Sequence, residues 1–372
     1  MSKPVIRTLL PMACDGVGPS FTCLNILSGA VRAGYDVELF VNRRRLNWLD
    51  IPTRAAFPGP LSWLPYKMIE SKATSILEKQ FMSAIKPGDI AYLWPAVSLE
   101  MHKALYEKKI PVVLEGINTR MASAKRILDT AYLEAGLTPS HSITDERIAE
   151  EEEKYKYTSA IFAPNRNVEL ALEDAPSNLK ILPASYGVNT KIPVPEPTYE
   201  DKDALTFMFC GYACIRKGVH LLLDAWRDMP PPHKLLLVGD VEPALMEKYR
   251  DVLESDQVEM IGFVNDVHEW FAKSDVFIFP SLEEGGPQVT YEAALHGLPI
   301  IASPMGSGRL HERADTMIVV EPRDAKALFE AMQEMLSVST RARLGQNAKK
   351  EANYFDWDRV GARRASMLLE LF

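Results

Sequence analysis

The sequence has no long apolar segment, no excess of positive charge and few cysteines. No run of about 18 apolar residues occurs, so we expect no membrane-spanning helix. Lys and Arg number 42 against 50 Asp and Glu, and the net charge of −8 argues against a nucleic-acid partner. Residues 1–18 lack a cleavage-site pattern, so we predict no signal peptide and a cytoplasmic location.

The four cysteines do not form a complete set of metal ligands. Only Cys210 and Cys214 are close in sequence, and no histidine or second cysteine pair completes a tetrahedral zinc site. We therefore predict buried, reduced thiols. Asp356-Trp-Asp358 matches a manganese-binding pattern, but it stands where the final helix is expected to begin, a position at which aspartate is a natural cap.

Strand-like and helix-like segments alternate along the 372 residues, which exceed the size of one hydrophobic core. Short apolar strands between helices predict parallel sheets that are covered on both faces. The pattern restarts after the proline-rich segment 192–197, whose stiff backbone suits a linker. We therefore predict an α/β protein with two doubly wound domains, residues 1–192 and 198–355. The expected strands are 4–10, 36–41, 89–93, 110–114, 160–163, 205–211, 234–238, 258–261, 276–279, 299–302 and 317–320.

The segment Ser281–Ser303, SLEEGGPQVTYEAALHGLPIIAS, follows a predicted strand and contains glutamates beside a glycine pair. Ligands of open α/β sheets bind at the carboxyl ends of the strands, where glycines and a helix N-terminus attract an anion. We expect Pro287 in the first turn of that helix. Glu284 and Glu292 would accept hydrogen bonds from hydroxyls, and the combination predicts a nucleotide-sugar site. The alternative is that Glu284 caps the helix and Glu292 is a surface charge.

The segment Phe207–Gly218, FMFCGYACIRKG, places two cations before a helix expected to begin near Val219. Cations at a helix N-terminus oppose the macrodipole by roughly 0.3–1 kcal/mol each. Arg216 and Lys217 therefore indicate a compensating anion, and a diphosphate would serve. The alternative is that both are solvated surface charges.

These segments resemble one known family. Glu284-Gly-Gly-Pro-x4-Glu292 resembles the E-x7-E motif of retaining glycosyltransferases with the GT-B fold, family 4 in the carbohydrate-enzyme classification. GYACIRKGVHLLLDAW resembles its phosphate-binding loop and helix, and VEMIGFVNDVHEWFAKSDVFIFPS its base-binding strand, helix and strand. PASYGVNTKIP resembles the interdomain segment, DGVGPS the first-domain glycine loop and AIFAPN the last strand of the first sheet. The resemblance implies two Rossmann-like domains facing a central cleft, with the final helix, residues 356–372, packed back on the first.

The resemblance also implies roles for single residues. Glu292 would bind the ribose hydroxyls and Glu284 the donor sugar. Lys217, with Arg216 beside it, would neutralise the diphosphate. The further contacts that it implies are the backbone of Gly286, Pro287, Gln288 and Val289 at the phosphates or the sugar, Phe263 and Val264 at the base, and Gly16 and Gly18 near the diphosphate and the acceptor. Members of the family need no metal or other cofactor and retain the anomeric configuration, with a donor phosphate oxygen taking the acceptor's proton.

The chain departs from the family pattern at two places. The usual arginine after the first glycine of the phosphate loop is Tyr212, so Arg216 would supply its charge. A first-domain histidine is missing from PVVLEGINTRMASAK, where Glu115 or Asn118 would make its contact to the sugar. Separately, segment 56–67 is apolar among prolines and is a candidate for contact with a lipid-linked acceptor at the inner face of a membrane. Ordinary packing under a loop is the alternative.

The resulting hypothesis is a glycosyltransferase that moves a sugar from a nucleoside diphosphate on the second domain to a glycan, lipid-linked or small-molecule acceptor on the first. Two other classes stay open. A nucleotide-sugar epimerase on the same fold would release a free epimer without an acceptor. A non-catalytic nucleotide-sugar-binding protein would fit the missing arginine and histidine. An NAD-dependent dehydrogenase is a weaker hypothesis, because Gly16-Val-Gly18 lacks the third glycine of a dinucleotide fingerprint.

Overall fold

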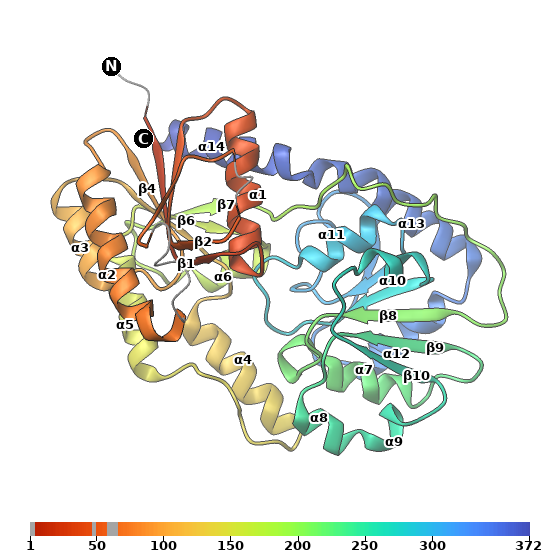
Figure 1. Ribbon diagram of the computed structural model, residues 1–372. Coiled ribbons are helices and arrows are strands. Elements are labelled where there is room, and N and C mark those ends of the chain that lie inside the picture. Colours follow the sequence, from red (N-terminus) through yellow and green to blue (C-terminus); the bar gives the residue numbers. More distant parts are fainter. Residues whose placement is uncertain (1–3, 47–49, 58–65) are drawn as a thin grey trace.

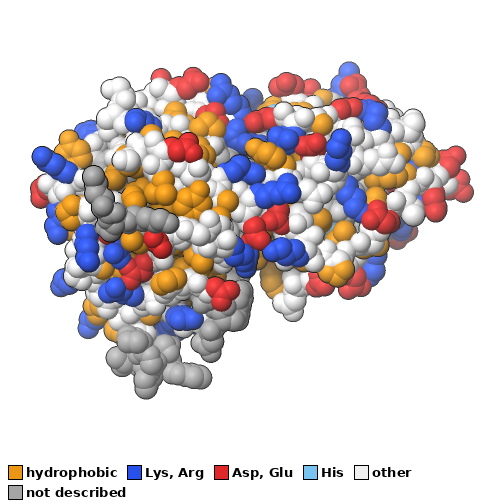
Figure 2. Space-filling model, turned by 90° about the horizontal axis from the view of Figure 1, so that it is seen from above, with side chains coloured by type: hydrophobic (Ala, Val, Ile, Leu, Met, Phe, Trp, Pro, Cys, Tyr) orange, Lys and Arg blue, Asp and Glu red, His pale blue; other side chains and the backbone are white. Residues whose placement is uncertain are grey.

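The computed structural model describes residues 4–46, 50–57 and 66–372, which form two parallel β-sheets flanked by helices (Figure 1). Figure 2 shows two lobes with an indentation where they meet, and basic and acidic side chains are interspersed on the face that it presents. Most of the apolar segment predicted as a membrane contact, including Trp63 and Leu64, lies outside the described residues.

The first sheet has seven strands. They are β1 (Ile6–Cys14), β2 (Val37–Arg44), β3 (Thr53–Ala55), β4 (Ile90–Leu93), β5 (Val112–Glu115), β6 (Ala160–Ala163) and β7 (Lys180–Pro183). The accompanying helices are α1 (Pro19–Arg32), α2 (Tyr66–Ala84), α3 (Leu99–Glu107), α4 (Met121–Glu134), α5 (Asp145–Tyr155) and α6 (Arg166–Ala171). The strand order β3-β2-β1-β4-β5-β6-β7 runs outward from β1 in both directions, as in doubly wound folds.

The second sheet has six strands and repeats this arrangement. They are β8 (Thr206–Cys210), β9 (Lys234–Val238), β10 (Val258–Gly262), β11 (Val276–Phe279), β12 (Ile300–Ala302) and β13 (Met317–Val319). The helical segments are η2 (Ile215–Lys217), α7 (Val219–Trp226), α8 (Pro243–Lys248), α9 (Arg250–Leu253), α10 (His268–Ala272), α11 (Gln288–Leu295), α12 (Ala325–Glu334), α13 (Val338–Ala352), η3 (Asn353–Phe355) and α14 (Trp357–Leu371). The order β10-β9-β8-β11-β12-β13 runs outward from β8.

The two sheets confirm the predicted fold class, and the expected strands agree with the observed ones to within a few residues. Every residue of β4, β6 and β11 is buried, as expected for parallel strands covered on both faces. The structure adds β3 and β7, which the sequence pattern did not indicate. Because β7 pairs with β6, the expectation that residues 160–163 form the last strand of the first sheet is wrong. As a half-exposed edge strand, β7 lacks the apolar run of the central strands.

The last helix, α14, packs against α1 of the first domain (Figure 1). A side chain at Gly29 would place its Cβ 2.4 Å from the carbonyl oxygen of Trp357. One at Gly361 would lie 2.2 Å from the carbonyl oxygen of Ile26. These two glycines therefore allow the two helix backbones to approach, and the C-terminal end of the chain becomes part of the first domain.

The structure contains the predicted aspartate cap and the predicted free thiols. The Asp356 carboxylate accepts the N–H of Asp358 at 2.9 Å, which confirms an aspartate cap on the final helix, and the helix begins at Trp357. The four cysteines are buried and free, as predicted. No helix in the described ranges is long and apolar enough to cross a membrane.

Candidate active site

The loops that follow β8 and β11 carry the two predicted motifs and form one surface. These strands are hydrogen-bonded parallel neighbours, so their carboxyl ends lie side by side. The carbonyl oxygen of Arg216 accepts the N–H of Leu282 at 2.9 Å and that of Glu283 at 3.3 Å. Gly218 has a φ of 69°, and a Cβ there would lie 2.1 Å from the carbonyl oxygen of Pro280. Only glycine fits this junction, which holds the two motifs together.

Lys217 and Glu284 form an ion pair on this surface. Nζ of Lys217 lies 2.8 Å from Oε2 of Glu284, and Nη1 of Arg216 lies 3.7 Å from the same oxygen. Nζ of Lys217 also lies 4.6 Å from the centre of the Phe279 ring, a cation–π contact. The side chains of Lys217 and Glu284 are 14% and 12% exposed. Burial alone would raise the pKa of Glu284, but the two cations outweigh it and lower the pKa, so the carboxylate is ionised at neutral pH.

Glu292, in the second turn of α11, has a different environment. Its carboxylate forms no hydrogen bond or ion pair with any residue that the structure describes, and burial raises its pKa to about 7. Glu292 and Lys217 both shift the pKa of the Cys210 thiol at the end of β8. Burial is the main cause of the raised pKa of Cys210, Glu292 raises it further, and Lys217 lowers it. The structure therefore pairs Lys217 with Glu284, and it places Glu292 on the helix that follows Glu284 in the same motif.

Glu283, the neighbour of Glu284, belongs to the site although the sequence analysis did not single it out. Its Oε1 accepts the N–H of Thr119 at 3.0 Å, and its Oε2 lies 3.4 Å from Nη1 of Arg216. The side chain is 3% exposed, and burial raises its pKa. The two adjacent glutamates thus point in different directions, Glu284 to Lys217 and Glu283 to the first domain. Two consecutive glutamates in the sequence do not reveal which of them bridges the domains.

The glycine pair of the motif lies where the first domain meets this loop. A Cβ at Gly285 would lie 1.9 Å from the carbonyl oxygen of Ile117, and one at Gly286 would lie 2.1 Å from the ring of Tyr186. Nδ2 of Asn165 donates to the carbonyl oxygens of both Glu284 and Gly285. Close approach of the domains is therefore one reason for both glycines, in addition to any approach of an anion.

The start of α11 presents unpaired backbone amides. Gly286, Gln288 and Val289 have N–H groups that donate to no residue in the described part of the chain. Pro287 occupies the cap position just before the helix rather than its first turn, and it has no N–H to satisfy. Nε2 of Gln288 donates to Oγ1 of Thr22 on α1, across the two domains. The free amides, together with the helix dipole, can bind an anion.

The other predicted donor contacts are more dispersed. Gly16 and Gly18, with φ of 79° and 54°, form the turn into α1, the helix that carries Thr22. Phe263 is 78% exposed just beyond the end of β10, and Val264 beside it is partly buried. Because β10 is separated from β8 by β9 only, these two residues share the carboxyl edge of the sheet with Lys217. They stay predictions as base contacts.

The proposed substitutes for the missing histidine differ in their exposure. Glu115 is wholly buried: its Oε2 lies 2.6 Å from Nη1 of Arg364 and accepts the hydroxyl of Tyr92. The other oxygen, Oε1, has no hydrogen-bond partner among the described residues, and Glu115 lines a cavity of the first domain, so its contact with the sugar stays a prediction. Asn118 is exposed and its backbone lies next to Gly285 at the domain contact, so it can reach a ligand.

The chain is similar in sequence to known glycosyltransferases. Residues 204–338 match the family model described as Glycosyl transferases group 1. This match covers just over a third of the chain and includes both motifs. Among curated relatives, the capsular polysaccharide biosynthesis glycosyltransferase CapM of Staphylococcus aureus is 28% identical over 40% of this chain and 41% of its own length. The lipopolysaccharide glucosyltransferase WaaG of Escherichia coli is 27% identical over 49% of this chain and 53% of its own. The chain thus spans about half the length of these relatives.

Solved structures match over the whole chain. Sucrose-phosphate synthase from Thermosynechococcus elongatus has a TM-score of 0.71 at 18% identity and covers 100% of this chain and 99% of its own. HepE of Anabaena, solved with UDP and glucose, has a TM-score of 0.67 at 18% identity and covers 98% of this chain and 100% of its own. With two Rossmann-like domains arranged as in these proteins, the chain has the GT-B fold.

Proposed function

We propose that the chain is a retaining glycosyltransferase that takes its sugar from a nucleoside diphosphate. The observation that carries the proposal is the Lys217–Glu284 ion pair next to the start of α11, where three amides donate to no described residue and where Glu292 lies in the second turn. Cations and amides suit a diphosphate, whereas carboxylates accept hydrogen bonds from the hydroxyls of a ribose or a sugar. The family match of residues 204–338 supports the proposal, and so do the glycosyltransferase names of curated relatives.

In the proposed reaction the second domain binds the donor. Glu292 accepts hydrogen bonds from the ribose, and Glu284, held in place by Lys217, accepts them from the sugar. As the bond from the anomeric carbon to the diphosphate oxygen breaks, negative charge grows on the leaving group, and Lys217, Arg216 and the free amides stabilise it. The acceptor oxygen bonds to the same face of the sugar and gives its proton to a donor phosphate oxygen, so the configuration is retained. The protein mainly positions the reactants, with no metal in the proposed step.

The acceptor in this proposal binds to the first domain and is a glycan, a lipid-linked compound or a small molecule. The names of CapM and WaaG place those relatives in capsular polysaccharide and lipopolysaccharide synthesis, which supports a glycoconjugate acceptor. HepE holds UDP, which supports a nucleotide donor. The cytoplasmic location and the membrane contact rest on the sequence alone.

A thermal-shift screen with UDP-, GDP- and ADP-sugars tests the proposed donor. A ligand at 100 times its Kd stabilises the folded state by about 2.7 kcal/mol, so one nucleotide series should raise Tm by several degrees. The protein should then release the nucleoside diphosphate and, with a suitable acceptor, form a new glycosidic bond. A free epimer as the product would identify an epimerase instead. Donor binding without transfer or slow donor hydrolysis would identify a binding protein.

The pH dependence of donor binding tests the role of Glu292. Because its pKa is about 7, an ionised carboxylate is present only above that pH, and donor affinity should fall about tenfold per pH unit below it. We expect Glu292→Gln to bind donor weakly with no such dependence. A pH-independent wild-type affinity between pH 5 and 8 would contradict the role.

Glu292→Gln should also change the free energy of unfolding, and the raised pKa of Glu292 decides whether the variant is more or less stable. Below about 4.5 the carboxyl is protonated whether the chain is folded or not, and above that pH the unfolded chain loses its proton first. Stability therefore falls as pH rises from 4.5 to 7, and the variant should be more stable at pH 8 by about 3 kcal/mol in urea unfolding. Glu284→Gln is the control. The folded protein lowers the pKa of Glu284, so this substitution should make the protein less stable at pH 8.

A further inference from the structure

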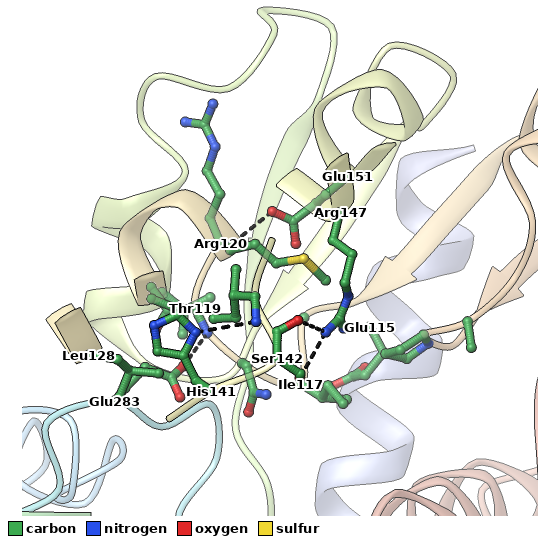
Figure 3. A pocket seen from close by; sticks show the side chains of 18 of the residues that line it. Glu115, Ile117, Thr119, Arg120, Leu128, His141, Ser142, Arg147, Glu151 and Glu283 are labelled. Carbon is green, nitrogen blue, oxygen red and sulfur yellow. Dashed lines mark hydrogen bonds between the residues drawn. The ribbon is translucent and has the colours of Figure 1, made fainter. Parts of the chain in front are cut away.

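A cavity of about 790 Å³ lies beside the proposed donor site, mainly within the first domain. Its walls come from the ends of β4 and β5, from α3, α4 and α5, and from the second-domain residues Tyr212, Cys214, Arg216, Glu242 and Glu283. Figure 3 shows Glu283 meeting Thr119 on one side, while Arg147 and Ser142 meet on another. The cavity and the donor site therefore share Arg216 and Glu283.

Four buried polar atoms of residues that line this cavity lack a hydrogen-bond partner among the described residues. They are Nε1 of Trp94, Nε2 of His102, Oε1 of Glu115 and Oγ1 of Thr119. Trp94 and His102 are each 1% exposed and Thr119 is 2% exposed. An unsatisfied buried polar group costs about 1–3 kcal/mol, so four of them on one cavity point to a ligand that completes them.

The hydrogen-bonding capacity of these atoms defines the ligand. Nδ1 of His102 lies 2.8 Å from the carbonyl oxygen of Ser98, so Nδ1 carries the proton and Nε2 is an acceptor. Burial lowers the pKa of His102 to about 4, which keeps the ring neutral. Nε1 of Trp94 can only donate. Hydroxyl groups can both donate to His102 and accept from Trp94, whereas a carbonyl group only accepts and an ammonium group only donates.

The charges around the cavity favour a neutral ligand. Nε of Arg120 lies 2.6 Å from Glu152, and Nζ of Lys154 lies 2.6 Å from Glu150, so both cations are neutralised. Within the described residues Arg147 is the one cation of the lining without a carboxylate partner, and it donates to Ser142. A single guanidinium beside several carboxylates is a poor site for a phosphate.

Apolar side chains complete the walls. Those along the lining include Val97, Leu114, Ile117, Met121, Ala124 and Leu128. A sugar ring has hydroxyls at its edge and C–H groups on its faces, so it matches a cavity that combines apolar walls with a few unsatisfied polar atoms.

We propose that this cavity binds the acceptor as a neutral, polyhydroxylated ring whose hydroxyls complete Trp94, His102 and Thr119. The inference rests on the proposed glycosyltransferase function and names the chemical class of its acceptor. The shared wall at Glu283 sets the ring next to the donor sugar that Glu284 would hold.

Binding of simple glycosides tests this inference. The probes are octyl β-glucoside, octyl β-galactoside and octyl α-mannoside below their micelle concentrations, with glucose and glucose 6-phosphate as comparisons, in isothermal titration. At least one octyl glycoside should bind saturably, and Trp94→Phe and His102→Phe should each weaken it at least tenfold. His102→Gln, which retains an acceptor oxygen, should recover part of the loss.

Matched controls exist in the second domain. Trp226 and His220 on α7 are also buried, and Nε1 of Trp226 and Nδ1 of His220 also lack described partners, but neither residue lines this cavity. Trp226→Phe and His220→Phe should bind the glycosides as the wild type does. Unchanged donor thermal shifts in the Trp94 and His102 variants would show that they are folded.

Three results would overturn the inference. The first is the lack of saturable glycoside binding, and the second is wild-type glycoside affinity in Trp94→Phe and His102→Phe. The third is tighter binding of glucose 6-phosphate than of glucose, with the difference lost in Arg147→Gln. If the nucleotide sugars still bind, the proposed function survives and only the acceptor class fails. If neither nucleotide sugars nor glycosides bind, the proposed function fails as well.

Discussion

Replacing Arg364 with methionine should destabilise the protein by roughly 3–5 kcal/mol, the usual cost of leaving a buried charge without its partner. The side chains of Arg364 and Glu115 are 3% and 0% exposed. Arg364 on α14 also donates to the carbonyl oxygen of Ser185 at 2.9 Å and lies 4.6 Å from the centre of the Phe162 ring. In the variant Glu115 keeps only the Tyr92 hydroxyl, so the unfolding midpoint in urea should fall and α14 should become sensitive to proteolysis.

Two further variants separate the ion pair from ordinary packing. Arg364→Met combined with Glu115→Leu removes both charges, and most of the lost stability should return, because an apolar pair of similar size can replace a buried ion pair. Arg363, the neighbour on the same helix, donates to the carbonyl oxygen of Tyr354 and has no carboxylate partner among the described residues. Arg363→Met should therefore cost less than about 1 kcal/mol. Equal losses in Arg363→Met and Arg364→Met would contradict the argument.

This ion pair shows what could not be predicted from one sequence. Glu115 stands in the segment that lacks the family's first-domain histidine, and the sequence indicates only a candidate contact with the sugar there, not an ion pair. Its partner lies 249 residues later on α14, and the contact depends on how the last helix packs against the first sheet. Local spacing carries no information on such a pair. The same holds for the cavity, whose Trp94 and His102 are ordinary core residues until the surrounding helices are placed.

The motifs after β8 and β11 could be predicted because their chemistry is local. In both motifs the helix begins nine residues after the strand ends (210 to 219 and 279 to 288), and a parallel sheet aligns the carboxyl ends of neighbouring strands. That reasoning was sufficient to expect Lys217 near Glu284. It did not indicate that Ile117 and Tyr186 fill the space beside the glycine pair, because these contacts join two domains.

The largest expected effect on activity is that of Lys217→Met, for which transfer should fall about 10²–10³-fold in kcat. Removing one preorganised group that stabilises developing negative charge costs other enzymes about this much. In the proposed mechanism Nζ of Lys217 stabilises the leaving diphosphate and, at 2.8 Å, fixes the Glu284 carboxylate. The measurement is the rate of nucleoside diphosphate release at saturating donor and acceptor, so that altered donor affinity does not contribute.

The loss of activity must be separated from a loss of stability, because Lys217→Met leaves the mostly buried Glu284 carboxylate with only Arg216 nearby, at 3.7 Å. The pKa of Glu284 should then rise, and part of the folding free energy should be lost. Adding Glu284→Gln removes the unpaired charge, so the double variant should regain stability. It should still fail in transfer, because neither the cation for the diphosphate nor the carboxylate for the sugar is present. A stable double variant with wild-type kcat would show that the ion pair serves only the fold, and the catalytic assignment of both residues would then have to be withdrawn.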